Sequence, residues 1–285
     1  MEDITYWIWL SILNLRPIEK IKLLEIFKNP KIIYYLSEKE LKKLTDSREL
    51  IKNITAKNKK NEANSIYNEA IKENIEIIKS NNQIYSKNLK KIYDYPIILY
   101  AKGNLELLNK KSISIVGCRN CSEYGKSIAQ KFGYLLSKKD YCIISGMAKG
   151  IDSYAHKGAI LAKGNTIAVL GSGVNYVYPL ENKKLYEEIL NKNGLIISEY
   201  GINTKPKPEN FPKRNRIISG LSEKILIVEA MNKSGSIITA ELAVEQGKNV
   251  YAIPGNITSI NSKGTNELIK DGAILVSSLE DIIDL

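Results

Sequence analysis

The chain has 285 residues, more than one typical domain of ~100–200 residues holds, and a formal net charge of +11 at pH 7 that points to a polyanionic partner. Its apolar start, from Tyr6 to Leu15, is too short to span a bilayer and has no basic flank, so we expect no secretory signal. With only three cysteines, we expect a cytoplasmic protein with no membrane partner.

Residues 1–80 predict a small all-α domain. Apolar side chains recur there at helical spacing, as at Ile18, Ile21 and Leu24. Between Leu13 and Leu24 the pattern resembles a degenerate SAM-like or helix-hairpin-helix-like unit, but it lacks the glycine with which such hairpins approach a phosphate. This favours a structural or protein-contact role over direct DNA contact.

Residues 81–285 predict an α/β domain. A lead-in strand near Tyr95–Tyr100 is followed by short apolar runs that alternate with helical patterns. The expected strands are 113–116, 142–144, 167–170, 195–197, 225–228, 250–253 and 274–276, and the expected helices include 127–137, 153–163, 183–192 and 236–246. Short apolar strands with crossover helices indicate a Rossmann-like fold, with a mostly parallel sheet covered by helices on both faces.

The turns of this region carry polar and basic residues that we expect to share one rim of the sheet, where such folds bind phosphates. Arg119 follows one strand, and Lys213 to Arg216 lie just before another. The candidate site residues are Arg119, Ser145, Gly146, Lys149, Lys183, Lys184, Lys213, Arg214, Asn215, Arg216, Ser234 and Gly235. Tyr176, Tyr178 or Phe211 could stack on bases beside them.

Other sites are disfavoured by the sequence. The Gly125-Lys126-Ser127 triplet lacks the upstream glycine of a phosphate-binding P-loop, and Tyr176 stands where a dinucleotide fingerprint needs its third glycine. The cysteines, with the single His156, lie in separate turns, so packing thiols are favoured over a metal or redox site. We expect no metal and no cofactor. Asp152 and His156 share a helix face, which fits a cap and a packing residue better than an acid–base pair.

Taken together, the motifs SISIVGCRN (112–120), SGMAKGID (145–152), FPKRNRIISGLS (211–222) and SGSIITA (234–240) resemble the DprA/Smf family of DNA-processing proteins. The resemblance implies a homodimeric, non-enzymatic protein that binds single-stranded DNA without sequence specificity. It also implies a partner, a RecA-type recombinase that the protein helps to load on incoming DNA during natural transformation.

The family's DNA pocket maps onto Arg119 and, less directly, onto Lys149, Lys183 or Lys184, Arg214 and Arg216. Two positions depart from the family pattern: Cys118 stands where serine is usual and Lys149 where arginine is common. We also expect no C-terminal winged helix, because little chain follows the last strand.

Two other functions stay open. Glu199 and Glu229 end strands, as acid groups of a nucleotide phosphoribohydrolase-like enzyme would, although the glycine-rich signature of those enzymes is absent. A pure protein-interaction scaffold is the third possibility, and it would bind no DNA.

Overall fold

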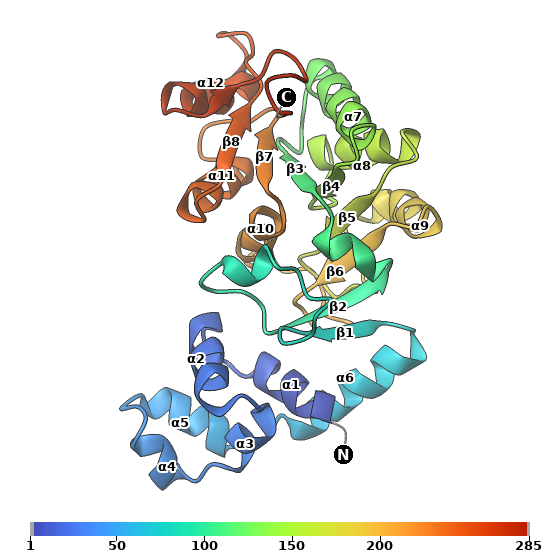
Figure 1. The fold of residues 1–285 in the computed structure, drawn as a ribbon. Coiled ribbons are helices and arrows are strands. Elements are labelled where there is room, and N and C mark those ends of the chain that lie inside the picture. The colour runs from blue at the N-terminus through green and yellow to red at the C-terminus, as the bar shows by residue number, and fades with distance from the viewer. Residues whose placement is uncertain (1–2, 284–285) are drawn as a thin grey trace.

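The N-terminal region is helical as the sequence predicts (Figure 1). The structure is a computed structural model that describes residues 3–283. The N-terminal helices are α1 (Asp3–Ile12), α2 (Pro17–Phe27), α3 (Pro30–Tyr35), α4 (Glu38–Lys42), α5 (Arg48–Thr55) and α6 (Lys60–Lys72). Ser37 starts α4 in a capping box with Glu40, because each side chain bonds the other residue's backbone N–H.

The rest of the described chain forms one nine-stranded sheet with the order β1-β2-β6-β5-β4-β3-β7-β8-β9. The strands are β1 (Glu76–Lys79), β2 (Ile98–Gly103), β3 (Ser112–Val116), β4 (Cys142–Ser145), β5 (Thr166–Val169), β6 (Leu195–Ser198), β7 (Lys224–Ile227), β8 (Asn249–Ala252) and β9 (Ile274–Leu275). The pairs β1–β2 and β2–β6 are antiparallel, and all other pairs are parallel. The predicted mostly parallel Rossmann-like sheet is therefore confirmed.

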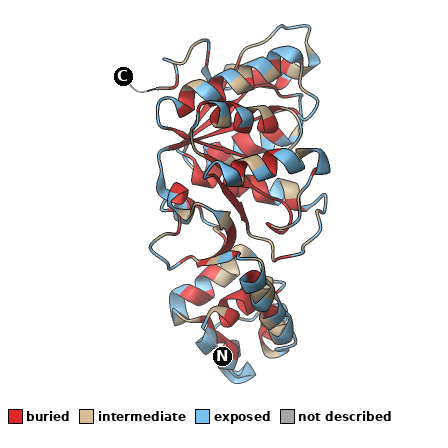
Figure 2. Ribbon diagram, turned by 90° about the vertical axis from the view of Figure 1, so that its right-hand side faces the viewer, coloured by how far each residue is buried: buried red, intermediate tan, exposed pale blue. Residues whose placement is uncertain are grey.

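Helices cover both faces of this sheet. They are α7 (Glu123–Ser137), α8 (Ile151–Leu161), α9 (Lys183–Asn191), α10 (Asn210–Leu221), α11 (Gly235–Glu245) and α12 (Lys263–Lys270), with short 3-10 helices η1 (Leu89–Lys91), η2 (Leu105–Asn109), η3 (Leu180–Asn182) and η4 (Ile260–Ser262). Alternate residues of β3 face opposite layers: Ile113 and Ile115 pack with α7 and α8, whereas Val116 packs with α10 and α11. In Figure 2 the strands are buried between helices whose outer faces are exposed.

The strand order reverses direction at β3. From β3 the chain runs outward through β4, β5 and β6, and it then returns to place β7 on the other side of β3. In parallel α/β sheets, ligands bind beyond the carboxyl ends of the strands at such a switch point. The turns that follow β3 and β7 are therefore the first place to look for a site.

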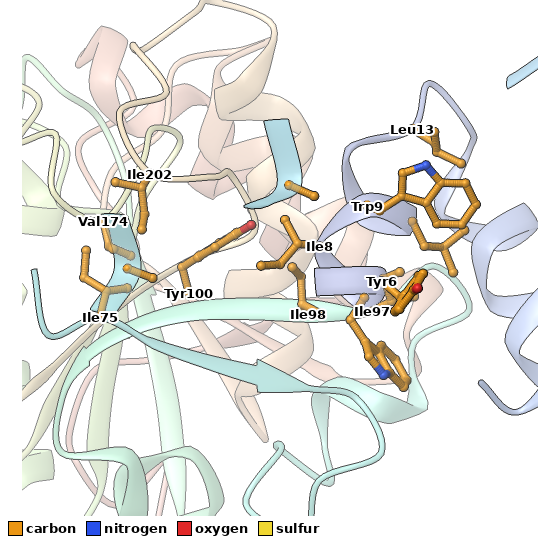
Figure 3. Packing of buried hydrophobic residues seen from close by; sticks show 14 of the residues in the cluster. Tyr6, Ile8, Trp9, Leu13, Ile75, Ile97, Ile98, Tyr100, Val174 and Ile202 are labelled. Atoms are coloured by element: carbon orange, nitrogen blue, oxygen red, sulfur yellow. The ribbon is translucent and has the colours of Figure 1, made fainter. Parts of the chain in front are cut away.

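The N-terminal helices share a hydrophobic core with the sheet. In Figure 3, Ile8 of α1 lies next to Ile98 and Tyr100 of β2, whereas Trp9 points away from the strand, beside Leu13. All of these side chains are buried. β1, which lies within residues 1–80, pairs with β2. The division into domains at residue 80 stays a prediction, since the hydrophobic contacts continue across it.

The region of helix α10 differs from the sequence-based expectation. Lys213 to Arg216 lie inside helix α10, not in a turn before a strand. Asn210 and every residue from Arg214 to Leu221 are buried, and Arg214, Asn215, Arg216 and Ser219 among them are polar. Because this helix is buried on all sides over that stretch and many of the buried residues are polar, it has no amphipathic pattern that would reveal it in the sequence.

No helix within residues 3–283 is both long and apolar enough to cross a membrane. In the same range, no three His, Cys, Asp or Glu side chains gather in a way that could hold a metal ion.

Candidate functional site

A cleft of about 570 Å³ opens at the switch point of the sheet. Its walls are the turn after β3, the turn after β7, the N-terminal half of α10 and the first turn of α11. Ser234 precedes α11 without a side-chain cap bond, so the first N–H groups of that helix are left for another acceptor. Free N–H groups at the start of a helix are a common binding place for phosphate.

A cation and two aromatic rings meet in this cleft. The guanidinium carbon of Arg119 lies 5.4 Å from the centroid of the Phe211 ring, and the rings of Phe211 and Tyr178 are 5.5 Å apart. Arg119 and Tyr178 are exposed. The arrangement offers a planar cation next to an aromatic surface, which suits a phosphate with an adjoining base.

Lys149 joins Arg119 at the edge of the cleft. A small cavity of about 100 Å³ is lined by both cations together with Tyr178 and Phe211. The ammonium group of Lys149 is ion-paired with Glu181, and both side chains are more than half exposed. A surface pair of this kind contributes little stability, so an anion can replace the carboxylate at small cost.

Arg214 forms the floor beneath these exposed groups. Its side chain is buried, and its Nη1 atom donates to the carbonyl oxygens of Gly146, at 2.8 Å, and Val169. Burial lowers the pKa of Arg214 to about 10, and the charge of Asp152 opposes that shift. The guanidinium is thus charged at neutral pH and fixes the ends of β4 and β5.

Gly146 and Gly150 shape the loop that carries Lys149. A Cβ atom on Gly146 would lie 2.7 Å from both Arg214 Nη2 and Asp152 Oδ2, so a larger residue would displace these two side-chain ends. Gly150 has φ +74° and packs against the backbone carbonyls of Cys118 and Arg119. The turn with Lys149 therefore rests directly on the turn with Arg119.

The carboxylates at the strand ends are both engaged by protein groups. Glu229, after β7, accepts hydrogen bonds from the backbone N–H and the hydroxyl of Ser122, the N-cap of α7. Glu199, after β6, pairs with Arg216, which also pairs with Asp94 at 3.0 Å. Each carboxylate fixes a loop in position, and neither lines the cleft.

The twelve predicted site residues separate into two groups. Arg119, Arg214, Asn215, Ser234 and Gly235 line the cleft, and Gly146 and Lys149 line the small cavity beside it. The other five lie elsewhere: Ser145, Lys183, Lys184, Lys213 and Arg216.

Each of these five has its own surroundings. Ser145 is buried and donates to Ile115 O at 2.7 Å. Lys183 and Lys184 are exposed on α9. Lys213 and Arg216 line a separate cavity of about 910 Å³ beside the N-terminal helices.

His156 and Asp152 have structural surroundings, as the sequence analysis favours. Asp152 accepts hydrogen bonds from Gly146 N and Ala148 N. The Thr166 hydroxyl donates to Ile143 O, so its oxygen accepts from His156 Nδ1 at 2.6 Å and the ring proton is on that nitrogen. Burial lowers the pKa of His156 to about 3, which keeps the ring neutral.

Sequence reasoning missed Glu181, the partner of Lys149, and the role of Asn215 as a link between Arg214 and α11. Asn215 accepts from Arg214 Nε and donates to Gly235 O at 3.1 Å. The Lys149–Glu181 and Asn215–Gly235 contacts have no local signal in the sequence, because their partners are 32 and 20 residues apart.

The fold and the cleft define a Rossmann-like protein with a polar, cationic and aromatic site at the carboxyl edge of its sheet. Residues 76–285 match the family described as DNA recombination-mediator protein A, and the chain belongs to this family. The resemblance to DprA/Smf proteins found in the motifs is thereby confirmed.

Two curated relatives illustrate the similarity. The chain is 44% identical over 197 residues to DNA processing protein DprA of Bacillus subtilis, which covers 69% of this chain and 66% of that protein. It is 41% identical over 211 residues to Protein Smf of Escherichia coli, covering 74% of this chain and 56% of that protein. The chain therefore spans slightly less than two thirds of the first relative and just over half of the second.

Two solved structures have the same fold. DNA processing protein A from Streptococcus pneumoniae is 33% identical, with a TM-score of 0.83 over 99% of this chain and 98% of that one. DNA processing protein A from Helicobacter pylori, known for its single-stranded DNA binding mode, is 31% identical, with a TM-score of 0.65 over 72% of this chain and 91% of that one.

Proposed function

We propose that this protein binds single-stranded DNA in the cleft at the switch point, without sequence specificity. The observation that carries the proposal is the exposed guanidinium of Arg119 beside Phe211 and Tyr178, above the N-terminus of α11. Phosphates would bind to Arg119, Lys149 and the helix N–H groups, and bases would stack on the rings. The single-stranded DNA binding of the Helicobacter pylori relative supports it.

The roles beyond DNA binding are proposals that follow from family membership. We expect the bound strand to be handed to a RecA-type recombinase in natural transformation or recombination, because the family is described as a recombination mediator. We also expect a homodimer. Large apolar side chains are exposed at Ile257, Ile260 and Leu275, near the end of the sheet, and would support such an interface.

The protein acts as a binding protein rather than an enzyme in this proposal. The hydrolase alternative depended on Glu199 and Glu229, and both carboxylates are held by Arg216 and Ser122 instead of facing the cleft. A catalytic acid or base must reach the reacting atoms.

The test is fluorescence anisotropy of a labelled single-stranded oligonucleotide at two salt concentrations, with the matching duplex as competitor. Tight binding that weakens with salt and resists the duplex is the expected result, because binding releases counterions. Absence of binding at low salt would reject the proposal. Incubation with adenosine monophosphate in parallel tests the alternative, since release of free base would demonstrate a hydrolase.

A further inference from the structure

A second basic and aromatic groove lies on the outer surface of α7 and α8, apart from the cleft. It has a volume of about 510 Å³ and is lined by Lys126, Lys131, Tyr134 and Tyr154, among others. None of the predicted site residues lies in it. The side chains that line the groove do not line the cleft.

Close packing of the two helices creates this groove. A Cβ atom on Gly133 would collide with the carbonyl of Ala155, and one on Gly158 would lie 2.8 Å from Tyr134 N. The two backbones are therefore in contact, and the larger side chains on either side form the walls. Figure 1 shows α7 and α8 next to each other on the same face of the sheet.

The groove combines positive charge with two rings, the exposed ring of Tyr134 and the half-buried ring of Tyr154. The ammonium group of Lys157 lies 4.7 Å from the centroid of the Tyr154 ring, and that of Lys126 lies 6.0 Å from it. Tyr134 is 39% exposed, with Lys138 at 5.6 Å from its ring. Glu123 is the one acidic residue in the lining, and it is ion-paired with Lys126.

The groove and the cleft share no lining residue, but the helices that form the groove start close to the turns of the cleft. Arg119 and Gly150 stand in touching turns, and α7 and α8 start a few residues after them. Glu123 and Tyr154 belong to the first turns of these helices, and Tyr134 lies 11 residues after Glu123, or about 16 Å along α7. The first residue of α7, Glu123, lies four positions after Arg119, so the entrance of the groove is close to the cleft along the chain.

We propose that the α7–α8 groove is a second segment of the single-stranded DNA path, in which lysines bind phosphates and Tyr134 and Tyr154 stack on bases. This inference rests on the proposed function of the cleft. Single-strand binders combine a cationic groove with aromatic platforms in this way, and in OB folds such a site covers about 4–16 nucleotides. Long oligonucleotides would fill the cleft and the groove, whereas short ones would fill the cleft alone.

The experiment measures the affinity for two labelled oligothymidylates, one of about 5 and one of about 25 nucleotides, by fluorescence anisotropy. The groove variant is Lys131→Glu/Lys157→Glu. The matched control is Lys39→Glu/Lys52→Glu, which reverses two exposed lysines on α4 and α5, in the N-terminal region. Both variants change the net charge equally, so any general electrostatic effect appears in both.

We expect the groove variant to bind the long oligonucleotide about tenfold more weakly than the control does. Its salt slope should be shallower by about 1.4, since two phosphate contacts at ~0.7 each are lost. Both variants should bind the short oligonucleotide alike, which also demonstrates that they are folded. Equal binding of the long oligonucleotide by groove variant and control would overturn the proposal.

A gain-of-binding variant tests the same idea without loss of any lysine. Glu123→Gln frees Lys126 from its ion pair, so the long oligonucleotide should bind several times more tightly and the short one as before. If the wild-type protein binds the short oligonucleotide and its affinity does not increase with oligonucleotide length, the proposal for the groove is wrong and the proposed function of the cleft stands. If it binds neither oligonucleotide, both proposals are wrong.

Discussion

The guanidinium of Arg119 lies 5.4 Å from the centroid of the Phe211 ring, although the two residues are 92 positions apart and belong to the turn after β3 and to α10. Arg119 is the one predicted DNA-binding residue in the turn after β3. Phe211 lies on helix α10, which is not predicted from the sequence. The contact places the charge and the stacking surface of the cleft within reach of one nucleotide.

We predict that Arg119→Ala weakens binding of single-stranded DNA about tenfold or more, to the same extent for all sequences, because a phosphate contact carries no base information. The salt slope should become shallower by about 0.7. Arg119→Lys should keep the slope, since the charge remains, but lose affinity because the planar contact with Phe211 is gone. Anisotropy titrations with three oligonucleotides of different composition measure all of these effects. Unchanged affinity of Arg119→Ala would remove this residue from the site.

Glu181 restrains Lys149 by an exposed ion pair. We predict that Glu181→Gln increases the affinity for single-stranded DNA several-fold and makes the salt slope steeper by about 0.7, because Lys149 becomes available to a phosphate. Glu187→Gln, an exposed position on α9, makes the same charge change away from the cleft and serves as the control. If the affinity for single-stranded DNA increases equally in the two variants, the increase reflects net charge alone and Lys149 is not part of the site.

Arg214 should be needed for stability more than for contact with DNA. Arg214→Met leaves the carbonyls of Gly146 and Val169 without their donor and Asp152 without its neighbouring charge. Removing one partner from a buried charged group typically costs about 3–5 kcal/mol of unfolding free energy. Urea denaturation measures this loss.

The double variant Arg214→Met/Asp152→Asn provides the control for Arg214. It removes both charges, and we expect it to recover part of the loss. A double variant that is no more stable than Arg214→Met alone would contradict this electrostatic account.

The fold could be predicted from the sequence because its signals are local. Short apolar runs such as 113–116 and 142–144 become β3 and β4 with shifts of one residue at an end. The site could be predicted only in part. Arg119 lies in a glycine turn whose position follows from the strand before it. Arg214 and Arg216 are two residues apart on α10, so they point to different sides of the helix, one to the cleft floor and one to Glu199.

The other contacts of the site depend on residues that are far apart in the sequence and meet only in the folded protein. Lys149 and Glu181 are 32 residues apart, and Glu229 is 107 residues from Ser122. A pattern of residue types along the chain does not say which opposite charges will meet. The same limit applies to the α7–α8 groove, whose lysines and tyrosines look like ordinary solvated helix faces until the two helices are placed together.

His156 should make the stability of the protein depend on pH. Its ring is buried and neutral, with a pKa of about 3, whereas a histidine in the unfolded chain titrates near pH 6.5. As the pH falls below about 6.5 the unfolded chain takes up a proton that the folded chain does not, so the free energy of unfolding decreases. The stabilising contribution of the neutral ring is fully present above that pH. Below it, the free energy of unfolding falls by roughly 1.4 kcal/mol per pH unit.

His156 is the only histidine in the chain, so no other histidine contributes to the pH dependence. Urea denaturation between about pH 7 and pH 5 keeps most carboxylates ionised. His156→Asn retains a donor toward Thr166 but cannot take up the proton, so it should be less stable than the wild type at pH 7 and lose the slope between these pH values. A variant whose stability still falls with the wild-type slope would assign the pH dependence to other groups and contradict a neutral buried His156.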